Sequence, residues 1–283
     1  MLQKNLKKHL EEQFSIKINS RKSLSGGDIN DVYLLKDQNK NYVVKVNEID
    51  KFPGMFKKEA SGLKALRDTK AIDVPEVLGY GDFEEHTYLL LEHKESGKAD
   101  RHFWEFFGQQ MAALHKNTRE TFGFEEDNYY GSLPQTNNKE ETAAKFFINQ
   151  RLAPQFKMAA ENGYDFKDLD SFYQKVAQLI PEEKPALIHG DLWSGNYLVN
   201  ANNKPCLIDP AVAYGPREMD LAMMQLFGGF DNRLFSVYNE TFPLEKDWKE
   251  RIKLWQLYYI LGHVNLFGGH YYTSAKDIIS RYR

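Results

Sequence analysis

Residues 189–196 read HGDLWSGN, and Ile208-Asp209-Pro210 begins twelve residues after Asn196. The two segments lie on a strand–loop–strand–strand pattern that follows predicted helices. They present a carboxylate at Asp191, an amide at Asn196 and a second carboxylate at Asp209. Phosphoryl transfer needs a carboxylate to position the attacking hydroxyl, and oxygen ligands to hold Mg²⁺ against nucleotide phosphates. These three side chains therefore predict a phosphoryl-transfer site.

The spacing H-x-D-L-x-x-x-N is that of a kinase catalytic loop. We expect Asp191 to be the catalytic carboxylate, Asn196 and Asp209 to bind Mg²⁺, and His189 to shape the loop by packing and hydrogen bonding. Alternatively, Asp191 and Asn196 are turn residues beside Gly190 and Gly195, and Asp209 caps a strand. Any one of them alone could be structural, whereas all three in this order favour function.

The chain before this loop predicts a small sheet. One helix is expected after Pro53 and a short amphipathic helix at the N-terminus, over residues 1–14. The lobe is expected to end near His93. Its five predicted strands, the first three of which form an antiparallel meander, cover residues 16–23, 32–36, 42–46, 74–79 and 87–92.

Helices dominate the remaining sequence. Short strands are predicted at 186–189, 197–199 and 205–209, and helices over 103–114, 146–158, 169–180, 217–227 and 244–267. We therefore predict an α+β, bilobal protein-kinase-like fold. Its small antiparallel N-lobe, with one main helix, would span residues 1–93, and its larger, mostly helical C-lobe residues 94–283.

A glycine-containing loop lies between the first two predicted strands. Because no helix follows it, neither a P-loop nor a Rossmann reading is supported, and a loop that covers nucleotide phosphates fits better. A Gly-Gly pair alone is more often an ordinary hairpin. We assign four of its residues to nucleotide binding, namely Gly26, Gly27, Asp28 and Ile29.

Lys45 lies in the apolar predicted strand at 42–46. A buried lysine destabilises the fold unless a negative charge compensates its ammonium group. Glu59, on the buried face of the next helix, is the expected counter-ion. Lys45 would then hold the α- and β-phosphates. Glu92, at the end of the last strand, is assigned to the same nucleotide site. Alternatively, Lys45 reaches water from an edge strand and Glu59 is solvated.

Two further residues are candidates near the catalytic loop. Trp193 lies two residues after Asp191, where its indole could contact the acceptor; alternatively, it packs beneath the loop. Asp220 precedes an apolar helical stretch. We expect its carboxylate to accept backbone N–H groups of the catalytic loop, although an acid in a first helical turn is also favoured by the helix dipole alone.

Composition narrows the class of protein. The 283 residues contain 37 Lys and Arg against 40 Asp and Glu, so the net charge of −3 implies no nucleic-acid partner. No uncharged apolar run approaches the ~18 residues of a membrane span. The single cysteine, Cys206, excludes an intramolecular disulfide and favours a cytoplasmic setting. Nothing in the sequence indicates an oligomeric state.

The chain resembles the fructosamine kinases, also called ketosamine-3-kinases. HGDLWSGN is that family's own form of the loop, whereas aminoglycoside and choline kinases share only HGD and the final Asn. The likeness covers nearly the whole chain. Similar segments include 26–29, 122–124, 133–137, 146–152, 211–220 (AVAYGPREMD), 221–230 (LAMMQLFGGF) and the HVNLF that ends at Phe267.

This resemblance implies ATP, Mg²⁺ and transfer of the γ-phosphate to the third-carbon hydroxyl of a ketoamine, which forms when a sugar glycates an amine. The ketoamine could be a small molecule or protein-bound, and the implied role is repair of glycated proteins or amines. Two alternatives stay open. One is a kinase of the aminoglycoside or choline type, and the other is a catalytically silent kinase-like binding module.

Overall fold

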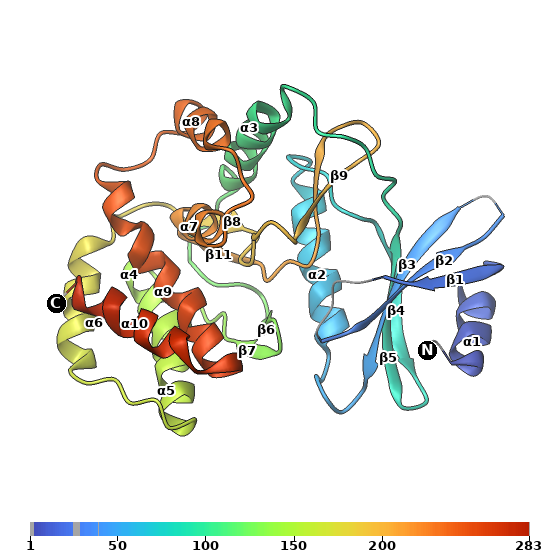
Figure 1. The fold of residues 1–283 in the computed structure, drawn as a ribbon, viewed down its shortest axis with the longest axis horizontal. Coiled ribbons are helices and arrows are strands. Elements are labelled where there is room, and N and C mark those ends of the chain that lie inside the picture. The colour runs from blue at the N-terminus through green and yellow to red at the C-terminus, as the bar shows by residue number, and fades with distance from the viewer. Residues whose placement is uncertain (1–2, 25–28, 39, 283) are drawn as a thin grey trace.

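The computed structural model describes residues 3–24, 29–38 and 40–282. A sheet-containing lobe and a larger helical lobe lie side by side (Figure 1). The sheet lobe is built from α1 (Lys4–Phe14), β1 (Ser20–Ser23), β2 (Asp31–Lys36), β3 (Asn41–Glu48), α2 (Met55–Asp68), β4 (Val77–Phe83) and β5 (His86–Glu92). Its strands are antiparallel, in the order β1-β2-β3-β5-β4.

The apolar run in β5 is continuous because both faces of this strand are covered. Leu90 packs in the cluster that contains Leu6 and Leu10 of α1. Leu89 and Leu91 pack instead in the cluster that contains the buried residues of α2. The sheet is thus sandwiched between two helices, and α2 lies on the side that faces the helical lobe (Figure 1).

The helical lobe surrounds a few short strands. Its elements are α3 (Phe103–His115), β6 (Asn128–Tyr130), β7 (Leu133–Gln135), α4 (Ala143–Phe146), the π-helix η1 (Phe147–Leu152), α5 (Ala153–Glu161), α6 (Leu169–Leu179), β8 (Ala186–Ile188), β9 (Tyr197–Val199), β10 (Pro205–Leu207), β11 (Ala213–Gly215), α7 (Glu218–Leu226), α8 (Asn232–Thr241), α9 (Trp248–Phe267) and α10 (His270–Ser280). Three antiparallel pairs form, β6 with β7, β8 with β11 and β9 with β10.

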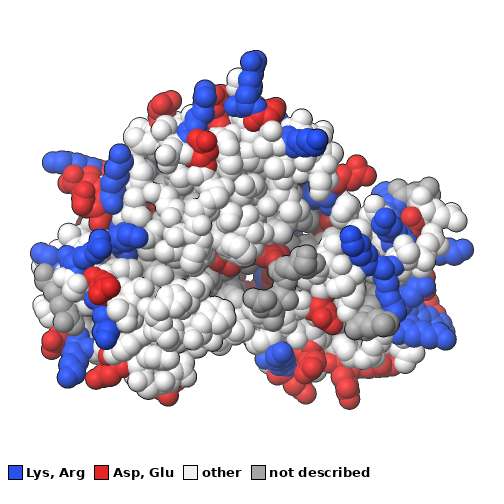
Figure 2. All heavy atoms as spheres, in the orientation of Figure 1, with Lys and Arg blue, Asp and Glu red and all other residues white. Residues whose placement is uncertain are grey.

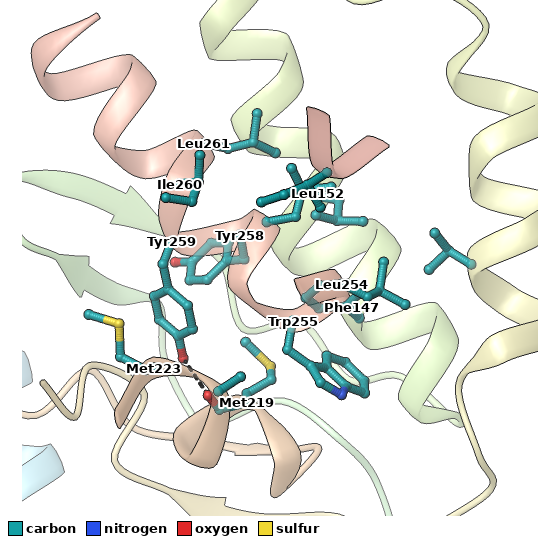
Figure 3. Close-up of a cluster of buried hydrophobic side chains, with 14 of the residues drawn as sticks. Phe147, Leu152, Met219, Met223, Leu254, Trp255, Tyr258, Tyr259, Ile260 and Leu261 are labelled. Carbon is teal, nitrogen blue, oxygen red and sulfur yellow. Dashed lines mark hydrogen bonds between the residues drawn. The ribbon is translucent and has the colours of Figure 1, made fainter. Parts of the chain in front are cut away.

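Helix α9 is the centre of this lobe. Its residues from Leu254 to Leu261 are buried around the whole helix, as expected for a helix that is enclosed rather than amphipathic. Figure 3 shows Trp255, Tyr258 and Tyr259 of this helix packed with the methionines of α7 and with η1. The core therefore connects α9 directly to the helix that carries Asp220.

The predicted bilobal α+β fold is confirmed, and several predicted boundaries are wrong. β4 begins at Val77 and not at residue 74, because Pro75 has no N–H to donate to a strand partner. β1 begins only at Ser20, since Ile18 packs into the core with α1. The predicted helix over 244–267 begins at Trp248. Elements β6, β7, β11, α8 and α10 were not predicted.

The predicted helix over 146–158 contains a π-helical segment. Pro154 has no N–H to donate to the carbonyl of Gln150, which instead accepts a hydrogen bond from Arg151 Nη1 at 2.9 Å. Six residues, Phe147–Leu152, are π-helical. Such segments are rare and often occur at functional sites.

Charges of both signs are interspersed over the surface. In the view of Figure 2 they gather around the edges of the molecule, while a broad middle region is largely uncharged. Acidic atoms are visible at the bottom of a hollow near its centre. Among the described residues, no helix is long and apolar enough to cross a membrane.

Candidate active site

The predicted catalytic loop, residues 189–196, connects β8 to β9. Gly190 has a φ of 84°, and a Cβ at this position would lie 2.1 Å from the backbone oxygen of Ala211. Only glycine fits here. At the end of the loop, Nδ2 of Asn196 donates to the backbone oxygen of Asp191 at 2.8 Å and to its Oδ2 at 3.2 Å. The loop therefore holds Asp191 and Asn196 against each other.

The carboxylate of Asp220 holds the start of the loop from below. Its oxygens accept the backbone N–H groups of His189 at 2.7 Å and Gly190 at 2.8 Å, and a ring nitrogen of His115 lies 3.2 Å away. Burial alone would raise the pKa of Asp220, but His115 and the Gly190 N–H group keep that pKa below its ordinary value. Asp220 therefore stays ionised while completely buried.

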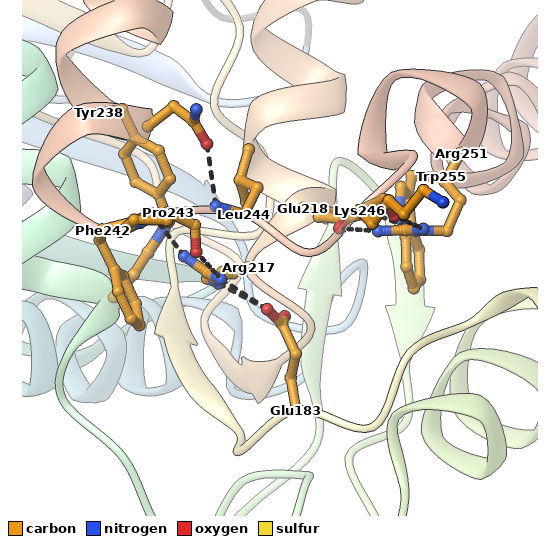
Figure 4. A network of polar contacts seen from close by, with 12 residues as sticks. Glu183, Arg217, Glu218, Tyr238, Phe242, Pro243, Leu244, Lys246, Arg251 and Trp255 are labelled. Carbon is orange, nitrogen blue, oxygen red and sulfur yellow. Dashed lines mark hydrogen bonds and ion pairs between the residues drawn. The ribbon is translucent and has the colours of Figure 1, made fainter.

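Two buried ion pairs fix the beginning of α7, the helix that carries Asp220 (Figure 4). Arg217 contacts Glu183 at 2.6 Å and also donates to the backbone oxygens of Phe242 and Pro243. Glu218 accepts from Arg251 at 2.6 and 2.9 Å and from the indole N–H of Trp255 at 2.7 Å. The position of Asp220 is thus set by contacts with three other segments of the helical lobe.

His189 connects the loop to the strand before Asp209. It is fully buried, and its Nε2 lies 2.9 Å from the backbone oxygen of Ile208, while its Nδ1 accepts the backbone N–H of Asp191 at 3.3 Å. These contacts fit a neutral imidazole that donates from Nε2. Burial also lowers the pKa of His189. Both ring nitrogens therefore have backbone partners, one in the loop and one at Ile208.

Lys45 forms ion pairs with residues of both lobes. Its Nζ lies 2.6 Å from Oε1 of Glu59 in α2 and 2.5 Å from Oδ1 of Asp209. Burial alone would lower the pKa of Lys45, but the charges of Asp209 and Glu59 raise it above its ordinary value. Lys45 is therefore a permanent ammonium group. The predicted pairing of Lys45 with Glu59 is present, and the contact with Asp209 is an addition.

Lys45, Glu59 and Asp209 line a cavity of about 230 Å³ between the lobes. A second cavity of about 500 Å³ adjoins it in the helical lobe and shares Gly131, Asp191 and Trp193 with the first. Asp191 thus lies where the two cavities meet. The remaining residues of the second cavity are mostly apolar or aromatic, namely Tyr130, Ser194, Met223, Phe227, His263, Leu266 and Phe267.

The indole of Trp193 forms part of the wall between the cavities. Trp193 is 41% exposed, in contrast to the fully packed Trp255. Its ring lies against the backbone of Gly195, where an added Cβ would be 2.3 Å from the ring. The structure therefore places this tryptophan on the surface of the site and not beneath the loop.

The structure brings most of the predicted site residues together. Ile29, Lys45, Glu59, Asp191, Trp193, Asn196 and Asp209 all line the cavity between the lobes. Gly26, Gly27 and Asp28 lie outside the described residues. The side chain of Glu92 points elsewhere, because its Oε2 pairs with Lys94 at 3.0 Å and lines a different cavity. A role of Glu92 in nucleotide binding would have to involve its backbone.

Sequence reasoning missed the contribution of the β6–β7 hairpin. Asn128, Tyr129 and Gly131 line the cavity between the lobes, and Tyr130 and Gly131 line the adjoining one. Lys58 also lines the first cavity, where its ammonium lies 4.8 Å from the centre of the Tyr129 ring. Only Lys58 had a local signal in the sequence that it could line the site, namely its position next to the predicted site residue Glu59.

Comparison with known proteins decides the family. The model of the family described as fructosamine kinase matches residues 1–283. The chain belongs to the fructosamine kinase family. This kinase is 40% identical to a probable ketoamine kinase of Synechocystis over 268 residues, which cover 94% of this chain and 90% of that protein. It is 39% identical to a probable ketoamine kinase of Enterococcus faecium, over 91% and 93% of the two chains.

Solved structures agree with this assignment. A candidate fructosamine-3-kinase from Haemophilus somnus superposes on the kinase with a TM-score of 0.88, at 31% identity, over 98% of this chain and 96% of that one. An aminoglycoside phosphotransferase, APH(4)-Ia, in complex with AMP-PNP and hygromycin B gives a TM-score of 0.66 at 16% identity, over 98% of both chains. The second likeness shows the fold alone.

The site of this fructosamine kinase fits a divalent cation. Burial, and then the negative charge of Asp209, raise the pKa of Asp191 well above its ordinary value. A cation near Asp209 would relieve this repulsion. Because both observed contacts of the Asn196 amide use Nδ2, its Oδ1 is left as a ligand. The described residues contain no cluster of three or more His, Cys, Asp or Glu side chains suited to a metal.

Proposed function

We propose that this enzyme transfers the γ-phosphate of ATP to the third-carbon hydroxyl of a ketoamine, and that this reaction serves the repair of glycated proteins or amines. The observation that supports this best is the position of Asp191 at the junction of two cavities. One cavity carries the charged residues that suit phosphates. The other presents aromatic and apolar surface that suits a sugar derivative.

On the nucleotide side, Lys45 would hold the α- and β-phosphates, with Glu59 keeping its ammonium in place. Asn196 and Asp209 would hold Mg²⁺. When bound, this ion neutralises charge on the phosphate oxygens. Lys45 would have to exchange its contact with Asp209 for the phosphates, while its 2.6 Å contact with Glu59 is retained. Gly26, Gly27, Asp28 and Ile29 would cover the phosphates.

On the acceptor side, Asp191 would orient the hydroxyl and accept its proton. As the oxygen–phosphorus bond forms, the bond between the γ-phosphorus and the bridging oxygen breaks and ADP leaves. A raised pKa makes Asp191 a better base than an ordinary carboxylate. Asp220 would act indirectly, because its contacts with the N–H groups of His189 and Gly190 fix the loop on which Asp191 lies.

Trp193 would contact the acceptor. A flat indole suits the apolar face of a sugar, and its π face favours a protonated ketoamine nitrogen by ~0.5–2 kcal/mol. The aromatic side chains of Phe227 and Phe267, which are 45% and 65% exposed, extend this surface within the same cavity. An open cavity of this kind also leaves space for a larger amine carrier.

A panel of acceptors tests the proposal. Purified enzyme would be assayed for ATP-dependent phosphorylation of fructosyl, ribulosyl and erythrulosyl amines, with choline and an aminoglycoside as controls, and the product would be located by NMR. We expect phosphate on the third carbon of at least one ketoamine and none on the controls. Turnover of choline or the aminoglycoside alone would favour the alternative kinase class. Nucleotide binding without turnover of any acceptor would favour a binding module.

A further inference from the structure

Asp209 adopts a backbone conformation that needs outside support. Its φ of 56° lies in the left-handed region, which costs a non-glycine residue about 1–3 kcal/mol and persists only where the surroundings enforce it. The segment that follows, residues 210–212, belongs to no helix or strand. Its backbone oxygens therefore need partners from elsewhere, since buried polar groups that lack a hydrogen bond are costly.

Those partners come from the β6–β7 hairpin. Nε2 of Gln135 donates to the backbone oxygen of Ala211 at 3.1 Å, and Nδ2 of Asn128 donates to that of Val212 at 2.8 Å. The two amides also bond to each other, Gln135 Nε2 to Asn128 Oδ1, at 2.7 Å. These two side chains, with Asn137, are called the amide clamp below.

The amide clamp is itself held in a single orientation. Asn137 donates to Asn128 Oδ1 at 3.1 Å and accepts from Arg151 of η1 at 2.8 Å. The hydroxyl of Tyr258, in α9, donates to Gln135 Oε1 at 2.6 Å. All five side chains are at most 5% exposed. Arg151 and Tyr258 each donate to an amide oxygen of the clamp, which fixes the side chains of Asn137 and Gln135. The nitrogens of Gln135 and Asn128 then donate to the backbone oxygens of residues 211 and 212.

We propose that the amide clamp is a positioning element that holds Asp209 in the geometry needed to bind Mg²⁺. The inference rests on the proposed role of Asp209 as a metal ligand. Gln135 acts on Asp209 indirectly. Its amide holds the backbone oxygen of Ala211, and Ala211 follows Asp209 by two residues. The same hairpin forms walls of both cavities, so the clamp also fixes the acceptor side relative to the metal side.

Gln135→Met tests this proposal, because methionine keeps the shape of the side chain but makes none of its amide hydrogen bonds. The matched control is Gln256→Met. Gln256 is also a buried glutamine, 2% exposed, whose Nε2 donates to a backbone oxygen at 2.9 Å, but that oxygen belongs to Ala222 in α7. Both variants should lose similar thermal stability, while only the first should affect Asp209.

Calorimetry would measure the affinity of each protein for AMP-PNP with and without Mg²⁺. We expect Mg²⁺ to strengthen binding to the wild type and to Gln256→Met equally. In Gln135→Met this enhancement should fall by at least about fivefold, the lower range of measured couplings between sites, with metal-free affinity little changed. If Gln135→Met does not fold, Tyr258→Phe, which removes only the hydroxyl that orients Gln135, should show a smaller reduction.

The possible failures are distinct. The clamp proposal would be overturned if Mg²⁺ strengthened AMP-PNP binding as much in Gln135→Met as in the wild type. Where Tyr258→Phe replaces that variant, the same result in Tyr258→Phe would overturn it. Either result would leave the proposed function intact. An equal reduction in Gln256→Met would show that the effect is general destabilisation and would also overturn the clamp proposal. A wild type that Mg²⁺ does not strengthen at all would refute the metal role of Asp209 and the clamp with it.

Discussion

The proposed catalytic role of Asp191 comes with a cost to folding. Its pKa is raised in the folded protein, first by burial and then by the charge of Asp209. A carboxyl group whose pKa is higher in the folded than in the unfolded state favours folding when protonated and opposes folding when ionised. The penalty is therefore present above the folded-state pKa, and it disappears as the pH falls below the unfolded-state value.

Asp191→Asn should separate these two effects. We expect turnover to fall by at least ~10²-fold, as for loss of a positioned acid–base group. The free energy of unfolding, measured with urea in the absence of nucleotide and Mg²⁺, should equal or exceed that of the wild type at pH 8. This difference should shrink as the pH is lowered towards 4. A variant that is clearly less stable at pH 8 would contradict the assigned pKa direction.

Trp193→Leu should change acceptor recognition and little else. Leucine keeps apolar bulk but loses the flat ring that lies between the cavities, and the residue is half-exposed, so little packing is lost. We expect a higher acceptor KM or a lower acceptor kcat/KM, with ATP KM and Tm nearly unchanged. A large fall in Tm with unaltered acceptor kinetics would instead indicate a structural role.

At the scale of elements, α7 depends on buried ion pairs at its beginning. Glu218 is 3% exposed and accepts three hydrogen bonds, two of them from Arg251 (Figure 4). Removing one partner of a buried pair leaves the other charge uncompensated, at a cost of about 3–5 kcal/mol. Glu218→Ala should therefore lower the free energy of unfolding by that amount and weaken catalysis, because α7 carries Asp220.

Glu141→Ala is the control for this measurement. Glu141 pairs with Lys145, four residues later in the sequence, at 2.7 Å, and both side chains are more than half exposed. Exposed pairs contribute little because water already screens their charges. Urea unfolding should show no significant change for Glu141→Ala. Equal losses in the two variants would mean that burial of the Glu218 pair does not determine its contribution.

The elements also show where sequence reasoning stops. Apolar periodicity predicted α2 and α6 well because each buries a face whose period is visible locally. It could not predict β6 and β7, which have three residues each and contain Asn, Gln and Pro. The polar side chains of these strands are buried by contacts with residues more than seventy positions away in the sequence. No local pattern encodes such contacts.

The same distinction applies to the site. Asp191, Asn196 and Asp209 were predictable because their spacing follows from one loop and the strands beside it. The pairing of Lys45 with Glu59 was predictable because an apolar strand and a buried helix face each contained one charge. The contact of Lys45 with Asp209 joins residues 164 positions apart, and the outward direction of Glu92 depends on Lys94. Both required the three-dimensional structure.

At the scale of the whole molecule, Lys45 links the two lobes. It contacts Glu59 within the sheet lobe and Asp209 in the helical lobe. A double-mutant cycle with Lys45→Met and Glu59→Gln, read as kcat/KM for ATP, should show strongly non-additive losses, because we propose that Glu59 acts only through the ammonium of Lys45. The single Lys45 variant should be the more damaged. Losses that simply add would show that the two residues act independently.

The exposure of Trp193 has an optical consequence. The chain has four tryptophans, of which Trp193 is 41% exposed on the wall of both cavities and Trp255 is enclosed in the core. An indole in water emits at longer wavelength than an enclosed one. It is also accessible to collisional quenchers, which do not reach an enclosed indole. A ligand that covers Trp193 should therefore shift its fluorescence to shorter wavelength and protect it from iodide. Subtracting the emission of Trp193→Leu would isolate this signal, so the intrinsic fluorescence of the enzyme should report a ligand that binds in either cavity, without any label or any turnover.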